Sequence, residues 1–530
     1  MPSDRERSEP PELIRFLGDP ASYPHRPATV RIIQTHISIV AIASPFVYKV
    51  KKAVDFGFLD FSTLEKRRHF CEEEVRLNRR LCARIYDGVV PIRQVEGRLA
   101  FGGEGEIVDY AVRMHELDER YFLHHLLAAG ALRARHIDRV VGALSVFYHR
   151  LSSIPDQSAW GRVEALRIST DENFAQTARF AGNLISQPAY ETIRAYVDQF
   201  YVSRAGLLEQ RRREGRIVDA HGDLRLEHIH ADRDGLCIYD CIEFSERLRT
   251  IDTASDIAFL AMDLDYAGCH DLARYFVTEM ARALDDSTLD GVIDFYACYR
   301  AYVRAKVESL RSEDREILEK ECTKSRDRAK RYYQLALRYA LFGAGPAVVV
   351  VMGRIGVGKS TLAGALGEAL GWEVVSSDRL RKEQAGLPLF ERASSETRSW
   401  LYTPHRTEAV YAALRERAVE RVRLGAGIVL DATFGRRAER EALRRTLPAR
   451  APVYFLEAVA SDDIIRHRLE ARSADAGVIS DARLEDMAAL SARYEATEAD
   501  EAPSVIRIAT DEPPEKVVEH ALRKLLRPYK

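Results

Sequence analysis

The sequence predicts two domains, an α+β domain followed by an α/β domain that contains a parallel five-stranded sheet. The chain has 530 residues, which is enough for two or three hydrophobic cores. Residues 27–341 place strand patterns before a long helical region, whereas residues 342–530 alternate strands and helices. The Gly-Pro cluster in LFGAGP, residues 341–346, breaks a helix between these two patterns. We therefore predict a domain boundary near residue 342.

The composition is ordinary for a soluble globular protein. Hydrophobic residues make up 46% and charged residues 30%, and 79 Lys and Arg against 81 Asp and Glu give a net charge of -2. This balance gives no global basic field, so nucleic-acid binding is possible only through local patches and is not favoured. The N-terminus has no apolar segment typical of a signal peptide, and no apolar run is long enough to span a bilayer. We expect a cytoplasmic protein that does not enter a membrane.

The seven cysteines are an odd number and form no CxxC pair. In a cytoplasmic protein this pattern predicts reduced and mostly buried thiols. The oligomeric state cannot be predicted from the sequence.

The N-terminal half begins with strand patterns. Residues 1–26 are predicted to be a polar tail, and HISIVAIASPFVYKVKKAV at 36–54 indicates a β-hairpin. A helix is expected over 62–86 with Ser62 as its N-cap, and EIVDYAVRM at 106–114 alternates as a strand does. Residues 116–215 and 252–340 have mostly helical patterns.

The C-terminal half contains five short apolar runs with helical segments between them. Such an alternation is typical of a parallel sheet covered by helices. The runs are AVVVVM, WEVVS, GIVLDA, VYFLEA and SVIRIA.

The first of these runs leads into GRIGVGKST, residues 353–361. It fits the P-loop pattern G-x-x-x-x-G-K-[ST], in which glycines turn backbone N–H groups toward phosphate oxygens before a helix N-terminus. Lys359 would reach the β- and γ-phosphates and Ser360 would ligate Mg²⁺. We therefore predict that ATP and Mg²⁺ bind here. The nucleotide-binding residues are Gly353, Gly356, Gly358, Lys359, Ser360 and Thr361.

Two carboxylates follow the next two strands. Asp378 would face the crevice at the strand ends and accept the proton of an acceptor hydroxyl, with Arg381 holding an anionic group. Asp431 is expected near Mg²⁺ and the substrate. As an alternative, either carboxylate would be a helix cap, and that alternative stays open here.

Arg468 and Arg472 lie four residues apart, on one face of a predicted helix. They would close over the phosphates and stabilise transition-state charge, or else form a solvated basic face. Residues 345–528 resemble the small P-loop kinases grouped with zeta toxins, gluconate kinases and the kinase module of polynucleotide kinases. The Asp378-x-x-Arg381 arrangement is similar to the acceptor site of that group, which implies that Asp378 is the general base.

The N-terminal half carries a second motif, HGDLRLEHIH at 221–230. In protein-kinase-like folds an Asp accepts the hydroxyl proton, a residue five positions later binds one metal ion, and an Asp after the next strand binds the other. Asp223, His228 and Asp240 hold these positions. Upstream, Lys49 or Lys51 would contact ATP phosphates. Glu74, on the following helix, would be the ion-pair partner of that lysine.

Residues 27–340 resemble the aminoglycoside phosphotransferase and choline-kinase-like family. The resemblance implies a two-lobed protein-kinase-like fold, in which Asp252 and Asp256 are structural. The two halves together resemble bacterial fusions of such a domain with a P-loop kinase. This chain departs from the family at His228, where the family has Asn, and it has no Gly-rich loop before FVYKVKKAV. Imidazole is a softer ligand than Mg²⁺ prefers, so a metal ion at this position is less favoured.

The leading hypothesis is an ATP-dependent phosphotransferase that acts on a hydroxyl of a small molecule, such as a sugar, an amino-sugar or a nucleoside. A nucleotide-binding regulatory protein with a pseudokinase N-terminal domain is one alternative. A polynucleotide-end kinase, favoured by the basic run RRAEREALRR, is another.

Overall fold

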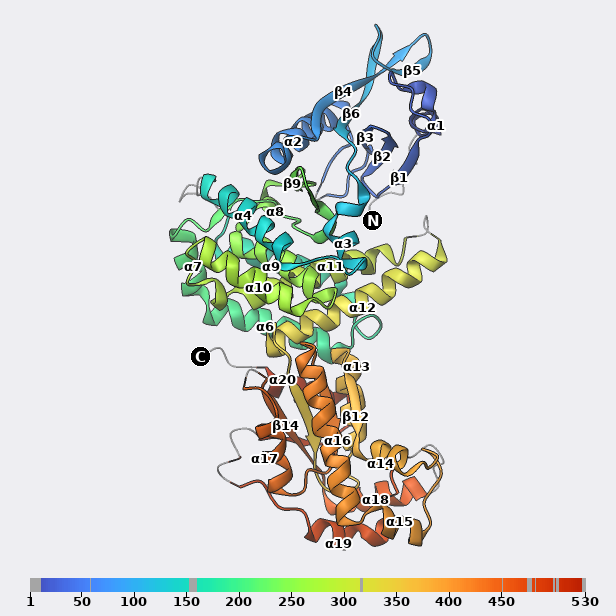
Figure 1. The fold of residues 1–530 in the computed structure, drawn as a ribbon, viewed down its shortest axis with the longest axis vertical. Helices are drawn as coiled ribbons and strands as arrows, with labels where there is room; N and C mark the ends of the chain where they lie inside the picture. The colour runs from blue at the N-terminus through green and yellow to red at the C-terminus, as the bar shows by residue number, and fades with distance from the viewer. Residues whose placement is uncertain are drawn as a thin grey trace. The chain divides into compact units, whose positions relative to one another are not determined.

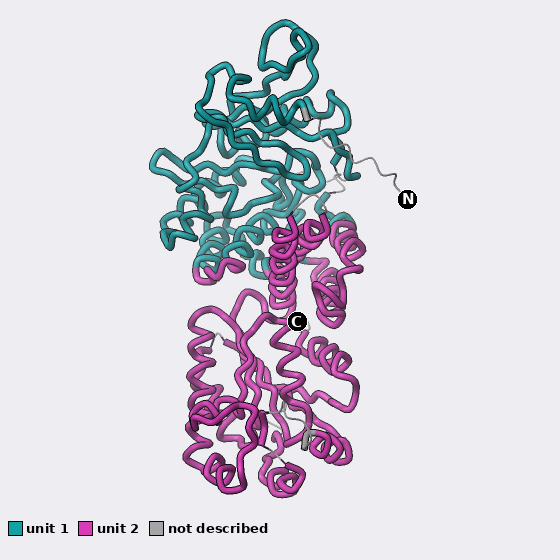
Figure 2. The backbone as a smooth tube through the Cα atoms, turned by 90° about the vertical axis from the view of Figure 1, so that its right-hand side faces the viewer, with its two compact units in different colours: residues 1–166, 207–264, 272–293 teal, residues 167–206, 265–271, 294–530 magenta. Residues whose placement is uncertain are grey.

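The computed structural model describes residues 11–57, 59–151, 160–314, 318–449, 451–473, 479–481, 483–498, 501 and 505–526. The chain divides into two compact units (Figure 2). Unit 1 contains residues 1–166, 207–264 and 272–293, and unit 2 contains residues 167–206, 265–271 and 294–530. Within the described ranges, the helices are all too short or too polar to cross a membrane.

Unit 1 begins with a six-stranded sheet whose neighbouring strands are all antiparallel. The predicted hairpin is confirmed, because Val40 on the second strand pairs with Lys49 on the third. The predicted strand over 106–114 is also confirmed. In spatial order the strands are β1 (Arg31–Gln34), β2 (Ser38–Ala43), β3 (Phe46–Lys51), β6 (Glu106–His115), β4 (Tyr86–Val95) and β5 (Arg98–Phe101).

The expected polar tail is wrong for residues 11–26. Helix α1 (Pro11–Gly18) and a 3-10 turn (Pro20–Ser22) pack against β2 and β3. Leu13, Phe16 and Leu17 are buried there, and the Tyr23 hydroxyl donates to the Leu17 carbonyl. Their i, i+3, i+4 spacing covers only two helical turns between prolines, which is too short for a clear periodic signal. Residues 1–10 lie outside the described part.

Helix α2 (Leu64–Cys82) covers the other face of this sheet, where Cys71 and Val75 contact Val112 and Met114. The helix begins one residue later than predicted. Thr63 is the N-cap, and its hydroxyl accepts a hydrogen bond from the backbone N–H of Lys66. Because side chains alternate along a strand, β3 presents Tyr48 and Val50 to α1 and Lys49 and Lys51 to the α2 side.

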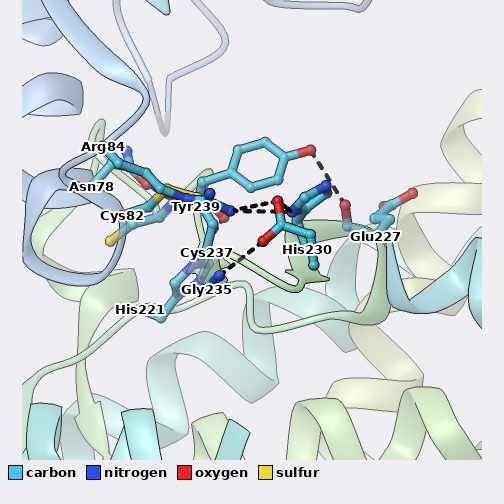
Figure 3. The surroundings of a disulfide bond; sticks show 11 residues. Asn78, Cys82, Arg84, His221, Glu227, His230, Gly235, Cys237 and Tyr239 are labelled. Atoms are coloured by element: carbon cyan, nitrogen blue, oxygen red, sulfur yellow. Dashed lines mark hydrogen bonds and ion pairs between the residues drawn. A yellow bond between two sulfur atoms is a disulfide. The ribbon is translucent and has the colours of Figure 1, made fainter. Parts of the chain in front are cut away.

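The expectation of only reduced thiols is also wrong. Cys82, at the end of α2, forms a disulfide with Cys237 on β9 (Gly235–Ile238) (Figure 3). The two Cα atoms are 4.8 Å apart, within the range that a disulfide bridges. The partners are 155 residues apart in sequence, and no local pattern pairs them.

The rest of unit 1 is mainly helical with two small antiparallel strand pairs, β7 with β10 and β8 with β9. The remaining elements assigned to it wholly or in part are α3 (Leu123–Ala128), α4 (Ala134–Arg150), α5 (Val163–Thr177), α7 (Ala205–Arg213), β7 (Ile217–Asp219), β8 (Ile229–Asp232), α8 (Glu246–Arg249), β10 (Thr250–Asp252), α9 (Thr253–Tyr266) and α10 (His270–Ala283).

Unit 2 contains the predicted parallel sheet, and all five strands are confirmed. Their order is β12 (Glu373–Ser376), β13 (Ile428–Asp431), β11 (Val348–Met352), β14 (Val453–Val459) and β15 (Val505–Ala509). Helices α13 (Lys359–Leu370) and α16 (Pro404–Arg423) pack against the sheet (Figure 1). The β11 residues Val348 and Val350 lie in one buried cluster with Leu414 and Val422 of α16.

Three long helices from the middle of the chain belong to the same unit. Helix α6 packs against α12 and α20, and α12 also contacts α13. The predicted boundary near residue 342 falls between the end of α12 and the start of β11. The other helices of unit 2 are α6 (Gln187–Ser203), α11 (Ile293–Arg311), α12 (Glu319–Phe342), α14 (Ser377–Ala385), α15 (Ser395–Leu401), α17 (Arg437–Thr446), α18 (Asp462–Ser473), α19 (Met487–Ala492) and α20 (Pro514–Leu525).

Candidate functional site

The carboxyl ends of three neighbouring parallel strands define the candidate site of unit 2. In the sheet register, Asp431 at the end of β13 pairs with Ser376 at the end of β12 and with Val351 near the end of β11. The P-loop follows β11, and Asp378 follows β12. Parallel order therefore brings these sequence-distant residues to one edge, where open α/β sheets bind ligands.

The P-loop turns through backbone conformations that favour glycine. Gly353, Gly356 and Gly358 have φ values of 140°, 71° and 92°. A Cβ on Gly353 would lie 2.5 Å from the Ala458 carbonyl oxygen, so a side chain cannot enter there. The loop ends at the N-terminus of α13, whose free N–H groups and dipole favour an anion. This backbone fits the phosphates of ATP.

Lys359 and Ser360 begin α13, and the exposed Thr361 follows them in its first turn. The Lys359 ammonium donates to the Arg354 carbonyl, at 2.8 Å, and its charge acts on Asp431. The Ser360 hydroxyl lies close enough to the Asp431 carboxylate to lower its pKa. These two oxygen groups fit Mg²⁺, which prefers hard donors. The described residues contain no cluster of three or more His, Cys, Asp or Glu side chains suited to a metal ion, so water and phosphate would complete the coordination.

The pKa of Asp431 is raised above its ordinary value, chiefly because the side chain is buried. The Lys359 charge and the Ser360 and Ser376 hydroxyls oppose this effect, whereas the Asp378 carboxylate adds to it. A proton therefore competes with a metal ion for Asp431 at a higher pH than for an exposed aspartate.

We expect the affinity of this site for Mg·ATP to fall as the pH drops from neutral toward about 4, the ordinary carboxylate range. Because the Asp431 pKa is raised, the loss begins above the pH at which an exposed aspartate titrates. Titration calorimetry at several pH values measures the effect. In Asp431→Asn the part of the pH dependence that comes from Asp431 should disappear and leave that of the nucleotide phosphate, whose second pKa is about 6. A pH dependence identical to that of the wild type would contradict the assignment.

Asp378 lies in the first turn of α14 and is partly buried. Arg381, one turn later, is 6% exposed and donates to the Leu401 carbonyl at 2.7 Å and to the Thr407 hydroxyl at 3.3 Å. These contacts fix α14 to α15 and α16. The predicted role of Arg381 in holding an anionic substrate group stays a prediction.

Arg468, on α18, lies directly against the P-loop. Its guanidinium donates to the Val357 carbonyl at 3.2 Å, and its Nη1 would lie 3.3 Å from a Cβ on Gly358. This arginine is therefore placed beside the phosphate-binding backbone. Arg472 belongs to the same helix, but its side chain lies outside the described residues.

Thr510 is a site-adjacent residue that the sequence did not indicate. It is buried, and its hydroxyl donates to the P-loop carbonyl of Val357 at 2.6 Å. Arg468 also donates to this hydroxyl, at 3.3 Å. Its position directly after β15, at the same sheet edge as the P-loop, was the only available signal.

In unit 1, Lys49 connects two of the predicted site residues. Its ammonium lies 3.0 Å from Glu74 on α2 and 2.7 Å from Asp240 after β9. Burial alone would raise the pKa of Asp240, but Lys49 and His228 outweigh it and hold this pKa well below its ordinary value. Asp240 also has a φ of 61°, in the left-handed region that few side chains other than Asn and Asp adopt. The carboxylate is thus held ionised, as a metal ligand requires.

Lys51 is buried with 1% exposure, away from solvent. It lies 2.7 Å from Glu74 and forms a second ion pair with Glu243, a residue that the sequence did not indicate. The Lys51 contacts fix α2 and the segment after Asp240 to strand β3. Of the two lysines, Lys49 is therefore the one placed to meet a phosphate.

The loop after β7 holds Asp223 in a fork of charge-assisted hydrogen bonds. Arg225 donates to both carboxylate oxygens, at 2.9 Å each. The same guanidinium lies 3.2 Å from Nε2 of His228, whose Nδ1 lies 2.9 Å from the Asp223 carbonyl. His228 Nε2 is 3.5 Å from Asp240. The loop therefore brings Asp223, His228 and Asp240 together, with Arg225 as a partner that the sequence did not indicate.

Asp256, on α9, holds this loop in place. Its carboxylate accepts the backbone N–H groups of His221 and Gly222, at 2.8 and 2.9 Å, and the Tyr148 hydroxyl at 3.1 Å. Gly222 has a φ of 86° and would meet Ile242 if it carried a Cβ. The two amides and the glycine turn explain why the His-Gly-Asp sequence folds as it does.

The comparisons with known proteins agree with the P-loop assignment. Residues 348–497 match the AAA_33 family model, described as an AAA domain. This part of the chain is thus a P-loop nucleotide-binding domain.

Over most of its length the chain is similar to mycobacterial proteins. It is 32% identical over 469 residues to the uncharacterized protein Rv2004c of Mycobacterium tuberculosis, covering 88% of this chain and 90% of that protein. The uncharacterized protein Mb2027c of Mycobacterium bovis gives the same values. This protein belongs to the family of Rv2004c.

Solved structures of kinases are also similar in part. A choline kinase from Cryptosporidium parvum is 10% identical with a TM-score of 0.38, covering 62% of this chain and 94% of that chain. A sugar kinase from Janibacter is 26% identical with a TM-score of 0.26, covering 34% of this chain and 96% of that chain.

Proposed function

We propose that this protein is an ATP-dependent phosphotransferase whose P-loop site transfers the γ-phosphoryl group to a hydroxyl of a small molecule. The observation that carries the proposal is the convergence of Lys359, Ser360, Asp431 and Asp378 at the carboxyl ends of adjacent strands. An ATPase needs the first three of these groups. The fourth is a carboxylate within electrostatic range of the phosphate site, where an acceptor would lose its proton.

The residues would divide the reaction among them. The acceptor oxygen forms a bond to the γ-phosphorus, the bond from that phosphorus to the β–γ bridging oxygen breaks, and ADP leaves with the bonding electron pair. Asp378 takes the hydroxyl proton. Lys359 and Arg468 stabilise the phosphoryl charge. Ser360 and Asp431 would hold Mg²⁺, which neutralises charge between the β- and γ-phosphates.

A screen of hydroxyl acceptors with ATP, read by mass spectrometry, tests this proposal. We expect a product heavier by one phosphoryl group, whose formation is lost in Asp378→Asn while ATP binding is retained. Arg379→Gln is a suitable control because Arg379 precedes Arg381 on the same helix and pairs with Glu383 at 2.8 Å. If the wild-type protein hydrolyses ATP but phosphorylates none of the acceptors, the site is an ATPase site.

Unit 1 is proposed as a second kinase-like site, supported by the connected set of Lys49, Glu74, Asp240 and Asp223. One observation favours the regulatory alternative. Both oxygens of Asp223 accept from Arg225, so the carboxylate is engaged where a general base would receive a substrate hydroxyl. A unit that binds nucleotide without turnover would have this arrangement.

His228→Asn tests whether unit 1 needs the imidazole at its candidate metal position. An amide oxygen is a harder donor than imidazole, so we expect any transfer from this unit to be preserved or raised. The measurement is phosphoryl transfer in a Lys359→Ala background, which silences the P-loop site. A loss of transfer would show that the imidazole, through its contact with the Asp223 carbonyl, is required.

A further inference from the structure

Three large aromatic side chains are exposed in the segment that follows the Asp378 helix. Phe390, Trp400 and Tyr402 are 58%, 45% and 42% exposed. They occur within a short stretch that runs from the end of α14 to the start of α16. Single exposed apolar residues are common, but a group of exposed rings beside a candidate catalytic carboxylate indicates a binding surface.

Two buried cations on α14 fix this aromatic segment relative to Asp378. Arg381 donates to the Leu401 carbonyl, directly before Tyr402. Lys382 donates to the Leu389 carbonyl at 3.0 Å and to the Glu391 carbonyl at 2.8 Å, on either side of Phe390. The helix that carries Asp378 therefore also holds both loops that carry the rings.

Two of the rings have a guanidinium group on one face. The Arg381 Cζ atom lies 4.3 Å from the centroid of Tyr402, and the Arg406 Cζ atom lies 3.4 Å from that of Trp400. Such stacking holds the ring orientation and contributes about 0.5–1 kcal/mol at exposed sites. The large exposed fractions of both rings leave apolar surface on which another planar ring can stack.

Tyr402 is the ring that the structure ties to Asp378. Arg381 lies three residues after Asp378 on one helix, so the two side chains project from the same face. The pKa of Tyr402 is raised well above its ordinary value, first by burial of the hydroxyl and then by the Asp378 carboxylate. The ring is therefore linked to the candidate base through Arg381 and lies within its electrostatic range.

The charges around the rings do not form a track for a phosphate backbone. Arg379 pairs with Glu383, and Arg398 pairs with Glu485 and Asp486. A single-stranded nucleic acid is bound by stacking together with a positive groove, and here Arg379 and Arg398 pair with carboxylates instead. The surface fits one planar ring better than a chain of them.

We propose that the acceptor of the P-loop site is a nucleoside, whose base stacks on Tyr402 and whose ribose hydroxyl thereby meets Asp378. This inference rests on the proposed function, since it names the acceptor of that reaction. Base stacking supplies the affinity, and the ribose supplies the hydroxyl that a planar ring alone lacks.

A binding experiment without ATP tests the surface independently of transfer. The full-length protein is titrated with cytidine and, as the ring-free control, with ribose, while tryptophan fluorescence is recorded. We expect quenching by cytidine that disappears in Trp400→Phe, because the other two tryptophans, Trp160 and Trp372, lie elsewhere in the chain.

Tyr402→Leu should weaken cytidine binding about tenfold or more, as loss of one base stack does. Phe56→Leu removes an exposed ring of unit 1 and should change nothing.

A transfer experiment then compares cytidine, ribose and a 5′-hydroxyl oligocytidylate as acceptors with ATP. Phosphorylated cytidine, with a raised KM and a nearly unchanged kcat in Tyr402→Leu, supports the inference. Equal use of ribose, or transfer only to the oligonucleotide with a steep salt dependence, overturns it. If no acceptor is phosphorylated but cytidine quenches Trp400, the proposed function fails while the aromatic surface stands as a nucleoside site. If cytidine neither binds nor reacts, the nucleoside inference fails, and the proposed phosphotransferase function is not contradicted.

Discussion

Arg211→Ala should destabilise unit 1 by about 3–5 kcal/mol, the loss expected when one partner of a buried ion pair is removed. Arg211, on α7, is fully buried and donates to both oxygens of Asp252, at 2.7 and 2.8 Å. It also donates to Asp286 at 2.8 Å and to the Thr288 hydroxyl. Without the guanidinium, two carboxylates that are at most 3% exposed would remain in the core without their charge partner. Thermal unfolding followed by circular dichroism measures the loss.

The pH dependence separates lost charge pairing from lost packing. Burial alone would raise the Asp286 pKa, but Arg211 outweighs it, and the net pKa is lowered. In the wild type this contribution is therefore present above the unfolded pKa of Asp286 and is lost as the pH falls. In Arg211→Ala the buried Asp286 carboxylate can take up a proton, so the difference in stability between wild type and variant should narrow toward about pH 4.

Arg213→Ala is the matched control for this prediction. Arg213 lies on the same helix but is 67% exposed and pairs with Glu209 at 3.8 Å. We expect its removal to change stability by less than about 0.5 kcal/mol. An Arg211→Ala protein as stable as this control would contradict the assigned role of the buried cluster.

Lys359→Ala should lower ATP turnover by about 10²–10³-fold, the loss typical of removing one group that stabilises transition-state charge. The Lys359 ammonium donates to a carbonyl of its own loop and lies within electrostatic range of Asp431. Its removal takes away the cation that would meet the β- and γ-phosphates but leaves the glycine backbone of the loop intact. Steady-state release of ADP measures the effect.

A control and a second-site variant show which unit is responsible for the activity. The control is Lys516→Ala, which removes a lysine of unit 2 that is 61% exposed and pairs with Glu519, and it should leave turnover unchanged. Asp223→Ala removes the candidate base of unit 1. If Lys359→Ala alone abolishes turnover, unit 1 does not contribute under those conditions. If neither Lys359→Ala nor Asp223→Ala alters turnover, the phosphotransferase proposal fails.

The sequence was most informative where one short segment determines its own conformation. The five apolar runs identified every strand of the parallel sheet. The signal is clearest for the central strands β11 and β13, which are buried at every position, because a strand buried on both faces is apolar throughout. The P-loop glycines have the left-handed or extended backbone that their spacing indicated. Asp240, His228 and Asp223 converge because a 3-10 turn and the β8–β9 hairpin between them return the chain to the same place.

Features that depend on distant partners could not be predicted. A cation after Asp378 is visible in the sequence, but the Leu401 carbonyl that receives Arg381 is not. The alternation of β3 places Lys49 and Lys51 on one face, yet only the positions of Asp240 and Glu243 distinguish the partly buried Lys49 from the fully buried Lys51. The Cys82–Cys237 pair was missed for the same reason.

That disulfide has a topological consequence. It closes the backbone from Cys82 to Cys237 into a covalent ring, which includes the Asp223 loop and leaves Lys49 and Glu74 outside. A single proteolytic cut inside the ring would release no fragment until the bond is reduced. In the chain-entropy model, closing a loop of this length also restricts the unfolded chain, which raises the free energy of unfolding by about 5 kcal/mol. A protein cut once inside the ring should therefore remain one covalent molecule under oxidising conditions. It should separate into two fragments after reduction.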